Sequence, residues 1–188
     1  PAHGFDESLV LPYSNDMWPN GYVPGDVTKN YPPLPWLADG VEFGTVQDWT
    51  DMDALTTVQG YRAVRFIRQN AGKGKPFFLY LATSMPHTPL GVSTAFKGKG
   101  VNRYADTMAD IDDTVGGVLA ALRETGVEKE TIVIFTSDNG PYWRPDYIER
   151  FHHQSAGEFR GMKGDAYEGG HRIPFLARWP GRIQAASQ

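Results

Sequence analysis

Apolar residues recur along this chain with two different periods, and each period predicts a different kind of element. Residues 51–69 and 104–125 carry apolar side chains three or four positions apart, the spacing of one face of an α-helix. Shorter apolar runs at 75–83, 132–135 and 175–179 are typical of β-strands. Because helices and strands alternate over this part of the chain, we expect an α/β fold built on a parallel sheet.

The first 50 residues show neither period and are rich in proline and aromatic residues. Proline fixes φ and removes a hydrogen-bond donor, so we expect irregular structure with turns at 14–16 and 24–26. The aromatic side chains need burial, which favours a packed excursion beside a binding cleft; a loop that only covers the sheet is the alternative. We therefore expect residues 1–52 to be a loop-rich segment and residues 53–188 the α/β core of one incomplete domain.

Composition narrows the possible partners. The chain has 188 residues, a net charge of −4 and no basic run, which argues against nucleic acid as a partner. No apolar stretch approaches the roughly 20 residues of a membrane-spanning helix. The absence of cysteine excludes disulfides, zinc thiolates and a cysteine nucleophile within this chain. Neither end carries a start or stop signal, so we expect a piece of a longer protein.

Asp138 and Asn139 follow the apolar run at 132–135. That run is unbroken and β-branched, which predicts a central strand buried on both faces. Ligands of open α/β sheets bind beyond the carboxyl ends of strands, where these two residues would lie. A carboxylate and an amide oxygen suit Ca²⁺ or Mg²⁺. The same Asp-Asn-Gly sequence also forms tight turns, so the residues alone leave a metal site and a plain turn both open.

Two basic side chains lie in loops of unusual composition. His87 follows the run at 75–83 and has a proline on either side, which suits a general acid or a ligand on a stiff loop; a surface histidine is the alternative. Lys163 lies among five glycines in the segment 157–174. Glycines allow close backbone approach, and a lysine there can bind an oxyanion; a merely solvated lysine is the alternative.

Four acids crowd the first half of the helix expected at 104–125: Asp106, Asp110, Asp112 and Asp113. The positive end of a helix dipole favours carboxylates at such positions. Asp112 points in a different direction from Asp110 and Asp113, so they do not converge on one ion. We expect these acids to be structural.

The order of these segments is more specific than any one of them. In chain order, the sequence contains a predicted strand followed by Pro-His-x-Pro, a predicted helix, and then three motifs: Ile-Phe-Thr-Ser-Asp-Asn-Gly-Pro, Lys-Gly-x-x-Tyr-Glu-Gly-Gly-x-Arg-x-Pro and Arg-Trp-Pro-Gly. Together with the loop residues 4–6 and 11–16 they resemble the formylglycine-dependent sulfatases, in particular the arylsulfatase type. The resemblance covers nearly the whole chain. It implies an alkaline-phosphatase-like α/β sandwich with a mostly parallel central sheet flanked by helices, of which this chain is a part.

The resemblance also implies roles for four residues. Asp138 and Asn139 would bind the active-site divalent cation, usually Ca²⁺, with Mg²⁺ as the alternative. His87 would protonate the leaving alcohol of a sulfate ester, and Lys163 would bind the sulfate oxygens. A sulfate ester needs its charge neutralised and its leaving oxygen protonated, which a metal, a lysine and a histidine supply.

Other family features are absent or secondary. The family's formylglycine derives from a Cys/Ser-x-Pro-x-Arg motif, and this sequence contains neither cysteine nor that serine motif. The paired acidic ligands of the family's first strand and an early Lys/His pair are also missing, so we expect these groups upstream of Pro1. His171 and Arg172 resemble residues that support the lysine loop. We expect the chain by itself to be inactive.

The predicted function is hydrolysis of an aryl or carbohydrate sulfate monoester by the full-length protein, with a sulfated small molecule or sulfated glycan as partner. The alternatives are a phosphatase or phosphonate hydrolase of the same superfamily, and a non-catalytic sulfate- or carbohydrate-binding relative. The resemblance further implies a secreted, periplasmic or lysosomal location.

Overall fold

The computed structural model describes residues 4–19, 31–143 and 145–188, and the chain divides into two compact units, Pro1–Val127 and Glu128–Gln188. The amino-terminal unit contains a three-stranded antiparallel sheet and two long helices: β1 (Leu9–Val10), β2 (Leu34–Ala38), β3 (Val41–Val46), α1 (Trp49–Asn70) and α2 (Arg103–Glu124). The carboxy-terminal unit contains a short 3₁₀ turn and four further elements: Glu128–Glu130, β4 (Val133–Thr136), α3 (Pro145–Phe151), α4 (Glu168–His171) and β5 (Phe175–Arg178).

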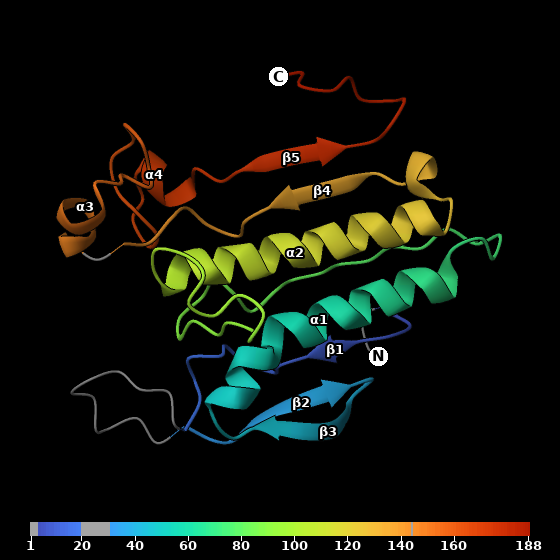
Figure 1. Ribbon diagram of the computed structural model, residues 1–188, viewed down its shortest axis with the longest axis horizontal. Coiled ribbons are helices and arrows are strands. Elements are labelled where there is room, and N and C mark those ends of the chain that lie inside the picture. The colour runs from blue at the N-terminus through green and yellow to red at the C-terminus, as the bar shows by residue number, and fades with distance from the viewer. Residues whose placement is uncertain (1–3, 20–30, 144) are drawn as a thin grey trace. The chain divides into compact units, whose positions relative to one another are not determined.

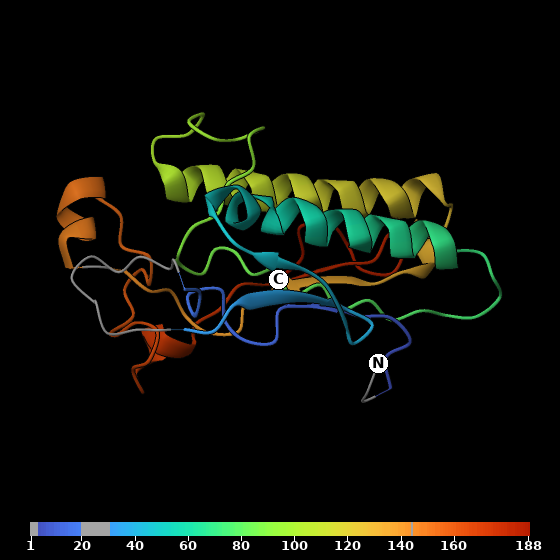
Figure 2. The same cartoon turned by 90° about the horizontal axis from the view of Figure 1, so that it is seen from below.

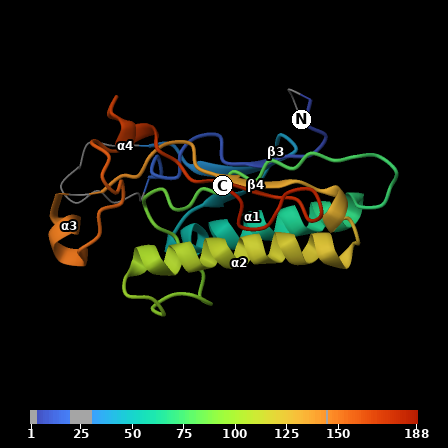
Figure 3. The ribbon, with the colours of Figure 1, turned by 90° about the horizontal axis from the view of Figure 1, so that it is seen from above.

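The two long helices confirm the prediction from periodicity. Asp48 caps α1 by accepting hydrogen bonds from two backbone N–H groups of the first turn, and Asn102 caps α2 by accepting one. Gly72 and Gly126 follow the last turns with positive φ, as helix-ending glycines do. The helices lie side by side and run in the same direction (Figures 1 and 3). Neither these nor any other helix in the described parts of the chain has the length and apolar character that crossing a membrane requires.

The core of the amino-terminal unit lies between the helices and one face of the three-stranded sheet (Figure 2). Eight buried side chains form it: Trp18, Leu34, Trp36, Val46, Met52, Leu55, Met85 and Ile111. The buried Trp18 indole donates its Nε1–H to Val46 O at 2.9 Å, so this polar group keeps a partner inside the core. Trp18 and Trp36 are buried, as expected for the aromatic residues of the first 50 positions, whereas Phe5 and Phe43 are 43% and 57% exposed.

Residues 34–46 form a β-hairpin, so the expectation of an irregular segment is wrong there. Asp39 and Gly40 make the turn with φ of 53° and 84°, the conformation that a two-residue Asp-Gly turn favours. Asp39 also bonds to Ser8 in both directions, through its backbone N–H and its carboxylate, which joins β1 to the hairpin. The Asp39-Gly40 turn therefore produces a hairpin despite the high proline content of the segment.

Of the two turns predicted in the first 50 residues, one can be compared with the structure. The turn at 14–16 is confirmed, because Met17 N donates to Ser14 O at 3.0 Å. The turn predicted at 24–26 lies outside the described residues.

The apolar run at 75–83 is extended but does not belong to a sheet, so the prediction of a strand is wrong in this structure. Its side chains alternate between partly buried and exposed, and Phe78 and Tyr80 are 73% and 72% exposed. The segment carries the chain back from the end of α1 toward the start of α2 (Figure 1). A strand requires a hydrogen-bonded neighbour, and none of the described strands pairs with this segment.

The carboxy-terminal unit contains one two-stranded sheet, in which β4 pairs with β5 in antiparallel fashion. The short strand predicted at 175–179 is confirmed, but the prediction that 132–135 is buried on both faces is wrong. With a single neighbouring strand, this sheet leaves large apolar side chains exposed: Ile134, Phe135, Phe175 and Leu176. All pairs among the described strands are antiparallel, so the mostly parallel central sheet is not confirmed.

Candidate functional site

Asp138 and Asn139 lie directly after β4, at the position expected for ligand-binding residues. Asp138 is exposed and Asn139 is half-buried. The Asn139 Nδ2 group donates to Gly140 O at 2.9 Å, a contact that does not use the amide oxygen. Carboxylate and amide oxygens suit Ca²⁺ or Mg²⁺, but two oxygens are short of the six to eight that Ca²⁺ takes. No group of three or more His, Cys, Asp or Glu that could hold a metal occurs among the described residues.

Lys163 lies in a tight turn that Asp165 closes. The Asp165 N–H donates to Met162 O at 2.9 Å, and its carboxylate accepts from Met162 N at 3.0 Å. The Lys163 side chain is exposed, while its backbone N–H donates to Pro141 O at 2.8 Å. That hydrogen bond fastens the lysine turn to the segment that carries Asp138 and Asn139.

A second hydrogen bond and one close backbone contact join the segment after β4 to the glycine-rich loop, and two further close contacts lie within that loop. Gly140 N donates to Gly170 O at 2.9 Å. A Cβ atom would lie 2.0 Å from Gly169 O if added at Gly140, 2.1 Å from Gly161 O if added at Gly169, and 2.2 Å from Asp165 O if added at Gly170. No side chain fits at these three positions. The glycines therefore allow one backbone segment to approach another, whereas the sequence suggested that they admit a ligand.

Stacked side chains stiffen the glycine-rich loop around Lys163. The Arg160 guanidinium lies 3.7 Å from the centre of the Tyr167 ring. The Arg172 guanidinium lies 4.3 Å from the centre of the Phe159 ring and forms an ion pair with Glu168 at 2.7 Å. Arg172 thus contacts the loop that the family resemblance expects it to support.

His87 lies in the amino-terminal unit, in the loop that precedes α2. Its Nδ1 atom is 2.7 Å from Thr88 O. A carbonyl oxygen only accepts hydrogen bonds, so Nδ1 is the donor in this contact. This contact orients the ring, and an oriented ring suits the predicted role as a general acid.

Two buried amide side chains hold the His87 loop, and the sequence analysis did not single them out. Asn15 is 3% exposed and donates through Nδ2 to His87 O at 3.4 Å and Pro89 O at 3.3 Å. Gln59 donates to Ser84 Oγ at 3.0 Å and accepts from Ser84 N at 3.1 Å. The sequence did contain one signal for Gln59, because it is a polar residue on the apolar face of α1. A buried amide requires hydrogen-bond partners, so its position predicts a structural contact.

The acidic cluster on α2 is structural where it is buried, as predicted. Asp106 accepts backbone N–H bonds from Gly98 at 2.8 Å and Gly100 at 2.5 Å, and Asp110 accepts one from Ser93 at 2.8 Å. The hydrogen bonds from Gly100 and Gly98 lower the pKa of Asp106 below its ordinary value. These carboxylates shape the loop between His87 and α2.

The structure brings three of the four predicted site residues together. Asp138, Asn139 and Lys163 lie on hydrogen-bonded segments of the carboxy-terminal unit. His87 belongs to the amino-terminal unit, and its convergence with the other three stays a prediction.

Solved structures place the fold in a known class. The chain matches the crystal structure of Ps i-CgsB in complex with k-i-k-neocarrahexaose with a TM-score of 0.71 and 26% sequence identity, over 97% of this chain and 41% of that one. The fold class is accordingly the α/β class of the alkaline-phosphatase-like enzymes.

Sequence comparisons then define the family. The family model described as Sulfatase matches residues 1–188. N-acetylgalactosamine-6-sulfatase of Rattus norvegicus is 36% identical over 193 residues, which cover 97% of this chain and 34% of the relative. Arylsulfatase A of Bos taurus is 33% identical over 193 residues, covering 97% of this chain and 37% of the relative. The chain belongs to the sulfatase family, and it spans about a third of the length of these relatives.

Proposed function

We propose that the full-length protein containing this chain hydrolyses sulfate monoesters. The observation that carries the proposal is the hydrogen-bonded junction of the lysine turn with the segment after β4, through Lys163 N and Pro141 O at 2.8 Å. It fastens the backbone of Lys163 to the segment that carries the oxygen donors of Asp138 and Asn139. Binding of a sulfate group requires such a combination, because its non-bridging oxygens carry negative charge.

Each residue has a defined task in this proposal. Asp138 and Asn139 would hold Ca²⁺ or Mg²⁺, which when bound supplies positive charge next to the sulfate oxygens. Lys163 donates from Nζ to a non-bridging oxygen. His87 donates its Nε2 proton to the bridging oxygen as the alcohol leaves. The nucleophile is a formylglycine that derives from a residue upstream of this chain, and this assignment rests on the family resemblance.

The proposal includes a larger domain around the two units. In it, a mostly parallel central sheet is flanked by helices, with residues 1–52 as a loop-rich segment of the same domain. The exposed apolar side chains of Phe78, Tyr80 and Ile134 support this, because strands of a covered parallel sheet are apolar on both faces. The family resemblance further supports an exported location: secreted, periplasmic or lysosomal.

The substrate class that fits best is a sulfated glycan. One relative is named for a sulfated amino sugar, and one structural neighbour was solved with a neocarrahexaose bound. Aryl sulfates remain suitable as assay substrates because they carry the same ester group.

Hydrolysis of 4-nitrophenyl sulfate by the full-length protein tests the reaction type. We expect turnover that EDTA abolishes and that Lys163→Gln lowers about 10²- to 10³-fold in kcat/KM. Lys129→Gln removes the same charge from an exposed 3₁₀ turn and should leave the rate unchanged. Turnover of phosphate but not sulfate esters would favour the phosphatase alternative. Binding of sulfate esters without turnover would favour the non-catalytic one.

A comparison of leaving groups tests the role of His87. Nitrophenolate is a stable anion that leaves without being protonated, whereas the sugar oxygen of a sugar sulfate must gain a proton in order to leave. We therefore expect His87→Asn to lower the rate on a sugar sulfate about 10²-fold or more, and the rate on 4-nitrophenyl sulfate far less. Equal losses on the two substrates would contradict a role as general acid.

A further inference from the structure

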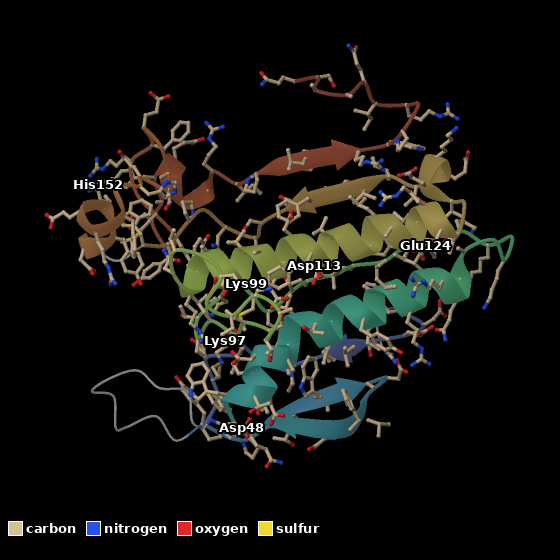
Figure 4. All side chains as sticks on the ribbon, in the orientation of Figure 1. Asp48, Lys97, Lys99, Asp113, Glu124 and His152 are labelled. Carbon is tan, nitrogen blue, oxygen red and sulfur yellow. The ribbon has the colours of Figure 1, made fainter. Side chains whose placement is uncertain are left out.

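A cavity of about 290 Å³ opens to solvent at the amino-terminal ends of α1 and α2. Its lining residues are Trp49, Lys97 and Arg103. Trp49 and Arg103 are the first residues of the two helices, and Lys97 lies on the loop before α2 (Figure 4). All three belong to the amino-terminal unit, which also contains His87.

Asp53 fixes both cations of this cavity. Its carboxylate accepts from Lys97 Nζ at 2.6 Å, from Arg103 Nη2 at 2.7 Å and from Val92 N at 2.9 Å. Arg103 Nε also donates to Leu90 O at 2.6 Å. Two cations share this carboxylate, whose side chain is 13% exposed, and Arg103 also interacts electrostatically with the Asp106 carboxylate, so two positive charges face two negative ones. A guanidinium has five N–H donors and an ammonium three, more than these contacts use.

Asp106 also faces this region, from α2. Its carboxylate accepts from Gly98 N and Gly100 N, so it orders the loop that presents Lys97. Side chains and loops held in this way lose little conformational freedom when a ligand binds, which favours affinity.

Trp49 supplies an apolar wall to the cavity. Its ring packs edge-on against the buried Trp18, with 5.5 Å between ring centres, and lies 5.4 Å from the Arg103 guanidinium. The Trp49 residue is nevertheless 43% exposed. A sulfated sugar ring matches this lining, because it offers apolar C–H groups to an aromatic ring and an anionic group to nearby cations.

We propose that this cavity binds a sulfated sugar unit of a glycan, at a position separate from the ester that is cleaved. The net charge of −4 gives a polyanion no general attraction to the chain, so such a ligand requires a local site. The Asp53 and Arg103 side chains fasten Val92 and Leu90, which follow His87 by five and three residues. Five residues span at most about 18 Å. One oligosaccharide could therefore reach both His87 and the cavity.

The inference extends the proposed function to an additional part of the substrate, but binding at the cavity requires no catalysis. It can be tested by calorimetric titration of the full-length Lys163→Gln variant, which should hydrolyse the ligand about 10²- to 10³-fold more slowly, with a sulfated neocarrahexaose. We expect Lys97→Gln in this background to raise Kd about three- to tenfold. Lys73→Gln removes the same charge from the exposed loop after α1 and should leave Kd unchanged.

Two further measurements keep the test decisive. Trp49→Phe preserves an aromatic ring against Trp18 but reduces the wall, and we expect it to raise Kd about threefold. The desulfated hexasaccharide should bind at least about tenfold more weakly than the sulfated one. The inference is overturned if the sulfated and desulfated sugars bind equally, or if Lys97→Gln and Trp49→Phe both bind like Lys73→Gln.

The outcomes separate this inference from the proposed function. Absence of sulfate ester hydrolysis together with Lys97-dependent binding would refute the proposed function and support the cavity. Hydrolysis together with binding that does not respond to Lys97 or Trp49 would support the proposed function and refute the cavity.

Discussion

Replacing Gly140 with alanine should separate the two segments that carry Asp138 and Lys163. Gly140 is not among the glycines with positive φ, so alanine can adopt its backbone conformation. The obstacle is contact, because the new Cβ atom would lie 2.0 Å from Gly169 O. Real Cβ atoms stay beyond 3.0 Å from such neighbours, so the segments must move apart by about 1 Å.

The expected cost follows from the two hydrogen bonds that this movement breaks. The bonds from Gly140 N to Gly170 O and from Lys163 N to Pro141 O measure 2.9 Å and 2.8 Å, and about 1 Å more takes both beyond bonding distance. At about 0.5–1.5 kcal/mol each, their loss amounts to about 1–3 kcal/mol. The steric clash by itself would cost a similar amount if the segments stayed in place. The two costs are not added, because the movement that breaks the hydrogen bonds also relieves the clash. We therefore expect the junction to weaken by about 1–3 kcal/mol.

Amide hydrogen exchange at Lys163 measures this junction directly. With 1.4 kcal/mol per factor of ten, the Lys163 N–H should exchange about 10- to 100-fold faster in Gly140→Ala. Gly116→Ala is the matched control: it lies inside α2 with nothing within 4 Å of the added Cβ, and should stabilise the helix by about 0.5–1 kcal/mol. Exchange of the Lys163 amide at the wild-type rate in Gly140→Ala would refute the reasoning.

Three further predictions concern the amino-terminal unit. The lowered pKa of Asp106 means that its carboxylate stabilises the fold above about pH 4, and that this stabilisation is lost as pH falls through the folded-state pKa. In Asp106→Asn, the free energy of unfolding measured with urea should therefore fall less steeply as the pH is lowered below about 4. An unchanged dependence on pH would contradict this. Asp53→Ala leaves two cations without their carboxylate and should lower the free energy of unfolding by about 2–4 kcal/mol in the same measurement. The control Asp113→Ala, at an exposed carboxylate, should lower it by less than about 0.5 kcal/mol. Asn15→Ala removes both amide contacts to the His87 loop, so it should lower kcat/KM of the full-length protein about tenfold without altering exchange at Lys163; an unchanged kcat/KM would argue against positioning by Asn15.

The amino-acid sequence determined the features that depend on neighbouring residues. Both long helices follow from apolar spacing, and they end at glycines that the sequence marks. The hairpin at 34–46 was also encoded locally, in the Asp39-Gly40 pair, but the prolines around it outweighed that signal in our prediction. The order of short motifs was sufficient to indicate the sulfatase family, because the combination is more specific than any single motif.

Only the tertiary structure decided how distant segments meet. Gly140 and Gly169 are 29 positions apart, and nothing in either segment shows that their backbones touch. The partners of Asn15 lie 72 and 74 residues away, so its role in holding the His87 loop had no local signal. Periodicity predicts which residues prefer burial, but burial itself depends on a covering layer, as the exposed side chains of β4 show. A local pattern reports the preferences of a segment, whereas the identity of its neighbour arises from packing across the whole fold.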